Sequence, residues 1–102
     1  MVLDVFISPL AKKDIEDIHE FIVADDRSAA DRVLERIIAV IGRLAERPFF
    51  GSDFHAAGLR DLRKMSIPPH IVFYRIKLNE LQVVRVLHGA RDLTDPELFP
   101  RK

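Results

Sequence analysis

The stretch HIVFYRIKLNELQVVRVL, from His70 to Leu87, decides how this chain folds. Its two halves, HIVFYRI and LQVVRVL, are dense in β-branched and aromatic residues, a composition typical of central strands. The residues between them, Lys77 to Glu80, are enough for a turn but not for the crossover of about a dozen residues that a parallel pair needs. The stretch therefore predicts two adjacent antiparallel strands in the middle of a sheet.

Two further strands are predicted upstream of this pair. Leu59 to Ile67 (LRDLRKMSI) is more polar, as in an edge or twisted strand, and Pro68-Pro69 turns it into the first central strand. Val2 to Ile7 (VLDVFI) predicts an opening strand. Phe49 to Gly58 has glycines, phenylalanines and no period, so we expect a loop that its aromatic rings hold against the core.

A helix is predicted directly after the opening strand. Ser8 is a good N-cap, and Pro9 fits the first helical turn, where its missing N–H removes no hydrogen bond. The apolar residues that follow recur at spacings of 4, 3 and 4, which is the period of one helical face. Asp25-Asp26 oppose the helix dipole and favour an end there.

The second helix is predicted from Ser28, which opens a capping box with Asp31, to Pro48. Its apolar stripe, Val33 to Leu44, is wide enough to contact both the first helix and a sheet. The order β-α-α-β-β-β predicts an α+β fold: an antiparallel sheet with a helical hairpin packed on one face, in a single domain spanning residues 1–102. We expect the opposite face of the sheet to be an exposed patch of the kind that binds partners.

Composition excludes several classes of protein. The chain has 102 residues and no cysteine, which excludes disulfides, a thiolate nucleophile and a cysteine-type zinc site. The four histidines show no paired ligand spacing, and no phosphate loop or other cofactor motif occurs, so we expect neither metal nor cofactor. No stretch approaches the ~20 apolar residues of a membrane span, and the first residues do not have the pattern of a signal peptide. We expect a cytoplasmic protein without a membrane partner.

Charge is unevenly spread although the formal net charge is +0. Residues 1–26 hold seven acids against two lysines, a net charge of −5, and residues 60–91 hold seven cations against two acids, a net charge of +5. This asymmetry indicates an anionic partner for the second half. Alternatively, the two halves neutralise each other across the fold.

Arginines and a histidine stand out in the basic half. Arg75 and Arg85 interrupt apolar strands, so each needs either an acidic partner or an open sheet surface. His88 ends a strand in the run LHGARDL; it is either a proton carrier or a structural residue at the strand end. Gly89 is expected to redirect the chain with positive φ. Tyr74 lies within an apolar run and is expected in the core.

Several stretches together carry a family resemblance. SPLAKKDIEDIHEFI, DRVLERIIAVIGRLAERPFFG, GLRDLRKMSIPPHIVFYRI and VVRVLHGARDL resemble the ParE branch of the RelE/ParE toxin superfamily. The resemblance implies the toxin of a type II toxin-antitoxin module, which binds and inhibits DNA gyrase rather than hydrolysing a substrate. It also implies a cognate ParD-like antitoxin, a ribbon-helix-helix protein with an acidic C-terminal segment. Operator DNA would be contacted only through that antitoxin.

The RelE branch, whose toxins cleave mRNA on the ribosome, is the alternative. A histidine-tyrosine ending found in one RelE subgroup corresponds to His88-Gly89 here, and glycine cannot transfer a proton, so no catalytic residue is assigned. A catalytic constellation of His88 with Arg60, Arg63 and Arg91 stays open. The candidates for binding target or antitoxin are Arg60, Arg63, Arg75, Arg85, His88 and Arg91, with Val40 in a groove between the helices.

Overall fold

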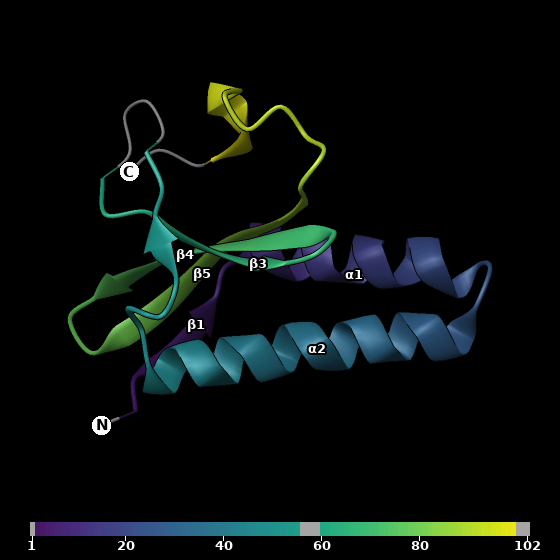
Figure 1. The fold of residues 1–102 in the computed structure, drawn as a ribbon, viewed down its shortest axis with the longest axis horizontal. Helices are drawn as coiled ribbons and strands as arrows, with labels where there is room; N and C mark the ends of the chain where they lie inside the picture. The colour runs from purple at the N-terminus through teal and green to yellow at the C-terminus, as the bar shows by residue number, and fades with distance from the viewer. Residues whose placement is uncertain (1, 56–59, 100–102) are drawn as a thin grey trace.

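A computed structural model describes residues 2–55 and 60–99 of the chain (Figure 1). Within these residues, two α-helices pack on a five-stranded sheet. The elements are β1 (Asp4–Ile7), α1 (Pro9–Val23), α2 (Arg27–Glu46), β2 (Ser52–Asp53), β3 (Arg63–Ile67), β4 (His70–Lys77), β5 (Glu80–His88) and the short 3-10 helix η1 (Pro96–Leu98). The predicted order is confirmed, with β2 added inside the segment expected to be a loop. None of the described helices is long and apolar enough to cross a membrane.

The strands lie in the order β1-β5-β4-β3-β2. The antiparallel pairing of β4 with β5 and of β3 with β4 is confirmed, in registers that place His70 opposite His88 and Met65 opposite Val72. The expectation of an antiparallel sheet needs one correction, because β1 pairs with β5 in parallel and the sheet is mixed. The rule for short connections could not have predicted this pairing, since both helices and three strands separate β1 from β5.

The two helices form the predicted hairpin, and their ends differ slightly from the prediction. Ser8 caps α1 as expected, its hydroxyl oxygen accepting a hydrogen bond from the Ala11 N–H at 3.0 Å. The cap of α2 is Asp26, which accepts from the Ala29 N–H at 3.1 Å, and not Ser28. Asp26 has the extended backbone of an N-cap, φ −154° and ψ 104°, so the helix starts two residues earlier than the capping-box pattern indicates.

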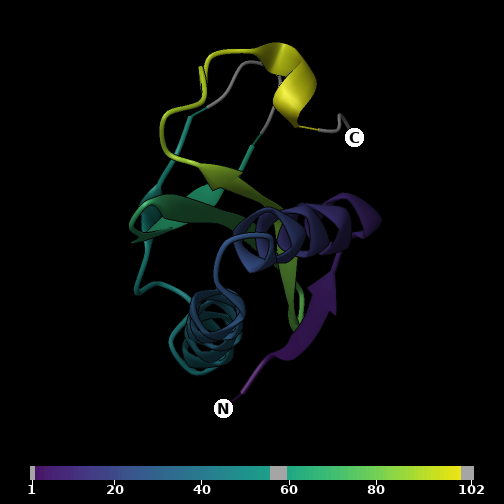
Figure 2. The same ribbon diagram turned by 90° about the vertical axis from the view of Figure 1, so that its right-hand side faces the viewer.

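Both faces of the sheet are covered (Figure 2). On one face, Ile37, Ile41 and Leu44 of α2 and Ala11 of α1 pack against the sheet in the main core. On the other face lies a second cluster, made by Leu62, Phe73, Val84, Leu87, Leu98 and Phe99, with Phe54, Ile71 and Leu93 at its border. The expectation of an exposed sheet face was wrong, because the C-terminal segment folds back and buries Leu98 and Phe99 there.

The aromatic residues of the 49–54 segment behave differently from one another. Phe54 packs edge-on against Phe73, with ring centroids 5.0 Å apart, and lies 5.8 Å from the Phe99 ring. Phe49 and Phe50 are 72% and 52% exposed. Only one of the three phenylalanines therefore anchors this segment as predicted.

Candidate functional site

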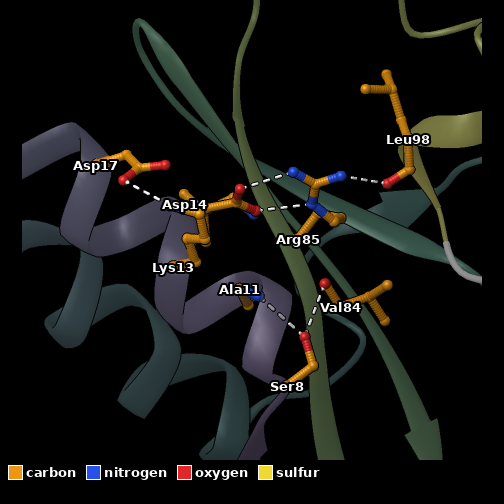
Figure 3. A network of polar contacts seen from close by, with 9 residues as sticks. Ser8, Ala11, Lys13, Asp14, Asp17, Val84, Arg85 and Leu98 are labelled. Carbon is orange, nitrogen blue, oxygen red and sulfur yellow. Dashed lines mark hydrogen bonds and ion pairs between the residues drawn. The ribbon is translucent and has the colours of Figure 1, made fainter.

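Arg85 of β5 links the sheet to α1 on one side and to the C-terminal segment on the other (Figure 3). Its Nε donates to Asp14 Oδ2 at 2.8 Å and its Nη2 to Asp14 Oδ1 at 2.7 Å, while Nη1 donates to the Leu98 carbonyl. Asp14 Oδ2 also accepts from the Val86 N–H at 3.0 Å. The hydrogen bond from Arg85 to this carboxylate raises the pKa of the guanidinium above its usual value, although burial opposes the rise. Arg85 therefore forms a structural ion pair with Asp14. Of the two alternatives predicted for it, an acidic partner or an open sheet surface, the structure shows the first.

Arg63 is also held by its neighbours. Its guanidinium donates to Asp53 Oδ1 at 2.7 Å, to the Gly51 carbonyl at 2.6 Å and to the Phe49 carbonyl at 3.2 Å, and stacks 5.1 Å from the centre of the Phe49 ring. Its Nε lies 3.4 Å from the hydroxyl of Tyr74, which is fully buried as predicted. Arg63 therefore fixes the 49–53 segment against β3.

The remaining candidates differ in how far they are available to a partner. Arg75 donates from Nε to Gln82 Oε1 at 2.9 Å, and Gln82 in turn donates to Glu80 at 2.8 Å. Arg60 is exposed at the start of the segment that leads into β3. Val40 is half-buried and packs against the main core.

His88 and Arg91 are brought together at a pocket of about 350 Å³ between α1 and the end of β5, here named the α1–β5 pocket. Its apolar wall comes from both elements, and its rim carries ionisable groups from α1, β4, β5 and the following turn. The lining residues are Asp14, Asp17, Ile18, Phe21, Ile22, His70, Val86, Leu87, His88 and Arg91. Both His88 and Arg91 are exposed, so this pocket is where two of the predicted site residues can meet a partner.

The two histidines of the pocket have different environments. Their rings meet edge to face, with centroids 5.6 Å apart. His70 is only 7% exposed; burial lowers its pKa most, and the nearby His88 and Arg36 lower it further. His88 Nδ1 accepts from the Ala90 N–H at 3.0 Å, so its neutral ring carries the proton on Nε2. Sequence reasoning missed His70, because an unbroken hairpin about the predicted 77–80 turn sets it opposite Leu87, and only the register shift between Phe73 and Tyr74 brings it opposite His88.

The chain turns after His88, but Gly89 does not have the left-handed conformation that was predicted for it. Gly89 does not have positive φ; instead its N–H donates to the Pro69 carbonyl at 2.8 Å, and a Cβ there would lie 3.3 Å from that oxygen. Close approach of two backbone segments, rather than a special φ, therefore explains the glycine.

The polar groups of the pocket constrain the chemistry that it can perform. The imidazoles of His70 and His88 are in contact, so a phosphate cannot be placed between them. Both carboxylate oxygens of Asp14 are engaged, and Asp17 forms an exposed pair with Lys13 at 3.3 Å. Among the described residues, no three histidine, aspartate or glutamate side chains gather as they would around a metal ion. The pocket has the character of an apolar cleft whose rim carries both acidic and basic groups.

A second, smaller groove of about 260 Å³ lies on the helical hairpin. Its described lining is Ile15, Glu16, His19, Glu20 and Leu34, and it does not include Val40. His19 Nε2 lies 2.9 Å from Asp31 Oδ1 and links the two helices beside this groove. A groove on the hairpin therefore exists, but nearer to the turn between the helices than the sequence suggested.

A helical hairpin on one face of a small mixed sheet is the architecture of the RelE/ParE toxins. The chain is similar to a structure of the chromosomal ParDE toxin-antitoxin system from P. aeruginosa, with a TM-score of 0.71 and 17% identity over 85% of this chain and 96% of that one. It is also similar to a chain of the RelBE2 toxin-antitoxin complex from Mycobacterium tuberculosis, with a TM-score of 0.67 and 16% identity over 86% of this chain and 99% of that one. At these identities the likeness shows the fold.

The family follows from the sequence comparison. The family of the ParE toxin of the type II toxin-antitoxin system parDE matches residues 5–93, and the chain belongs to it. The protein Y4kP of Sinorhizobium fredii, whose name describes it as a toxin, is 33% identical over 79 residues, which are 78% of this chain and 80% of that protein. The chain is thus a ParE-like toxin of a type II toxin-antitoxin system.

Proposed function

We propose that this toxin acts in the cytoplasm by binding and inhibiting DNA gyrase, without cleaving RNA. The observation that carries the proposal is the state of the proton-transfer groups in the α1–β5 pocket. RNA cleavage requires a base and an acid placed around one phosphate. Here His70 is buried, Asp14 is committed to Arg85, and His88 is the imidazole that reaches solvent. A pocket of this kind supports binding better than acid–base chemistry.

One arrangement favours the alternative, a RelE-type ribosome-dependent mRNA endoribonuclease. Asp17 and Arg91 line the same pocket as His88. A carboxylate, an imidazole and a guanidinium are the groups that could serve as base, acid and phosphorane stabiliser. The alternative therefore predicts that cleavage of mRNA depends on His88.

Parallel assays of DNA supercoiling and cell-free translation distinguish the two functions. The purified toxin is expected to block gyrase supercoiling while a reporter mRNA stays intact on the ribosome. Ile38→Lys, which changes an exposed apolar residue of α2 outside the pocket, serves as a matched surface control. Cleavage of the mRNA at fixed codon positions, lost in His88→Ala, would refute gyrase binding as the mechanism.

The pocket also supports an antitoxin partner of the ParD-like type, a ribbon-helix-helix protein with an acidic C-terminal segment that contacts operator DNA on behalf of the complex. Phe21 is 81% exposed at the pocket wall, which is unusual for a large apolar side chain. An amphipathic segment could place apolar side chains against Phe21 and Ile18 and carboxylates toward Arg91 and His88. Such a segment would fill the pocket and pair its carboxylates with the Arg91 side of the rim.

Titration calorimetry with the cognate antitoxin tests this docking site. Phe21→Ser and Arg91→Glu are each expected to weaken binding at least ~10-fold, since apolar anchors and charges at an interface core contribute more than about 1 kcal/mol. Ile38→Ser, the matched change on α2, is expected to leave the affinity within about 3-fold of the wild type. Equal affinities for all three variants would place the antitoxin elsewhere on the toxin.

A further inference from the structure

Strand β1 forms one edge of the sheet, and among the described strands β5 is its single neighbour (Figure 2). In a parallel pair, alternate residues turn their backbone groups toward the neighbouring strand. The Asp4 N–H donates to the Asn79 carbonyl and the Ser8 N–H to the Val83 carbonyl, each at 3.0 Å, so the even-numbered residues face β5. The N–H and C=O groups of Val5 and Ile7 consequently point away from the sheet.

The part of β5 that extends past β1 shows how this protein closes a free edge. There the Ser8 hydroxyl donates to the Val84 carbonyl at 2.9 Å (Figure 3). Asp14 accepts from the Val86 N–H at 3.0 Å. Side chains of the segment that begins α1 thus satisfy the backbone groups that β1 leaves unpaired. The edge continues into β1 itself, where no corresponding side chain among the described residues bonds to the outward groups.

Apart from the charge of Asp4, the described part of the β1 edge lacks the usual protection against strand addition. Natural edge strands carry lysine, proline or a bulge, or are covered. The opposite edge of this sheet, β2, is two residues long and polar. By contrast, β1 reads DVFI and forms a regular register with β5. Exposed apolar side chains gather on β1 and the residues next to it: Val2 is 63%, Val5 44%, Phe6 47% and Leu10 43% exposed.

From this edge we infer that the toxin forms a homodimer in which β1 pairs antiparallel with β1 of a second copy. A two-fold axis through Phe6 sets Val5 opposite Ile7 of the other copy, which pairs the outward N–H and C=O groups of all four residues. The two Phe6 side chains then face each other across the axis, as an aromatic cross-strand pair. Asp4 lies opposite Ser8, so no like charges meet.

This register is what selects a second copy as the occupant of the edge. Centring the axis on Asp4 would set the two Asp4 carboxylates against each other, and centring it on Val5 would set Asp4 against Phe6. An acidic segment from another protein would bring its carboxylates close to Asp4, a like-charge contact that costs affinity. The self-paired arrangement centred on Phe6 avoids both problems. With one short strand per copy, the contact is small, and interfaces below about 1,200 Å² give weak, reversible association.

Sedimentation velocity of the purified chain tests the inference. The protein concentration is varied from roughly 1 µM to 1 mM, the range in which weak association is detected. The apparent mass is expected to rise from 11.7 kDa toward twice that value as concentration increases. Val5→Pro removes an N–H that the monomer does not use for its own sheet, and Phe6→Lys places two like charges at the axis. Both variants are expected to stay monomeric, while Ile38→Lys, which changes an exposed apolar residue on α2, dimerises like the wild type.

Far-UV circular dichroism and thermal melting show which variants keep the fold, and Phe6→Lys decides the matter if Val5→Pro disturbs β1. A wild-type chain that stays at 11.7 kDa throughout would overturn the inference, as would dimerisation of well-folded Phe6→Lys equal to that of the wild type. If the wild type is monomeric and Val5→Pro instead loses antitoxin binding, the edge accepts an antitoxin strand and the homodimer is wrong. All measurements on the toxin alone are independent of its effect on gyrase.

Discussion

Removing the Asp14 carboxylate should cost more stability than any other single truncation on α1. The side chains of Asp14 and Arg85 are 11% and 13% exposed. In Asp14→Ala the Arg85 guanidinium keeps its bond to the Leu98 carbonyl but loses its counter-charge, and the Val86 N–H loses its acceptor. Breaking a buried ion pair by deleting one partner costs about 3–5 kcal/mol. We take the lower end, about 3 kcal/mol, because a little solvent reaches the pair.

A loss of this size is easy to measure. For a domain of about 100 residues, 1 kcal/mol lowers the melting temperature by roughly 4–8 °C, so Asp14→Ala should melt roughly 12–24 °C below the wild type. The chain has no tryptophan, and urea unfolding is best followed by far-UV circular dichroism. The double variant Asp14→Leu with Arg85→Met should recover part of the loss, since it leaves no buried charge without a partner.

Asp17→Ala is the matched control for this measurement. Asp17 lies on the same helix and pairs with Lys13 at 3.3 Å, but these side chains are 60% and 70% exposed. Exposed pairs of this kind contribute at most about 0.5 kcal/mol. If Asp14→Ala and Asp17→Ala unfold within about 0.5 kcal/mol of each other, Arg85 does not hold the layers together and the reasoning fails.

Three further outcomes are expected. Gly51→Ala should destabilise the chain by about 1–3 kcal/mol, because its Cβ would collide with the backbone of β3 and with the buried hydroxyl of Tyr74. Gly42→Ala, on the open side of α2, should instead raise the free energy of unfolding by about 0.5–1 kcal/mol, and urea titration compares the two variants. Burial lowers the folded-state pKa of His70 below 6.5, so the unfolded chain binds more protons than the folded chain as the pH falls below 6.5. The contribution of His70 to stability should therefore be complete above that pH and decline below it. NMR titration should show this pKa returning toward 6.5 in His88→Ala. Arg91→Glu should leave the free energy of unfolding within about 0.5 kcal/mol of the wild type in the same titration, since that side chain is exposed.

Local patterns predicted most of the fold because local physics decides most of it. The composition and short turn of the β4–β5 hairpin leave only an antiparallel pair, and the Ser8-Pro9 signal starts α1 at the residue observed. The parallel pairing of β1 was outside the reach of such rules. It depends on how the helical hairpin returns the chain to the sheet, which no short stretch of sequence encodes.

The candidate site was only partly predictable, for a related reason. An arginine within a strand was recognised as needing a partner, but Asp14 is 71 residues away from Arg85, and Asp53 is ten residues from Arg63 along the chain. Both arginines therefore looked equally available as binding residues. His88 and Arg91 could be identified because the sequence predicts where the strand ends, and side chains at such an end are exposed. The burial of Leu98 and Phe99 needed the path of the whole C-terminal segment, which has no periodic signal.

The pairing of β1 with β5 also sets when the protein can fold during its synthesis. The ribosome makes β1 and the helical hairpin first, but β1 has no strand to pair with until residues 80–83 have been made. The Asp14–Arg85 contact and the closure over Leu98 come later still. Contacts between residues so distant in sequence form slowly. A nascent toxin therefore spends most of its synthesis with its hairpin uncovered and its fold incomplete, an interval in which another protein can bind the hairpin before the finished toxin exists.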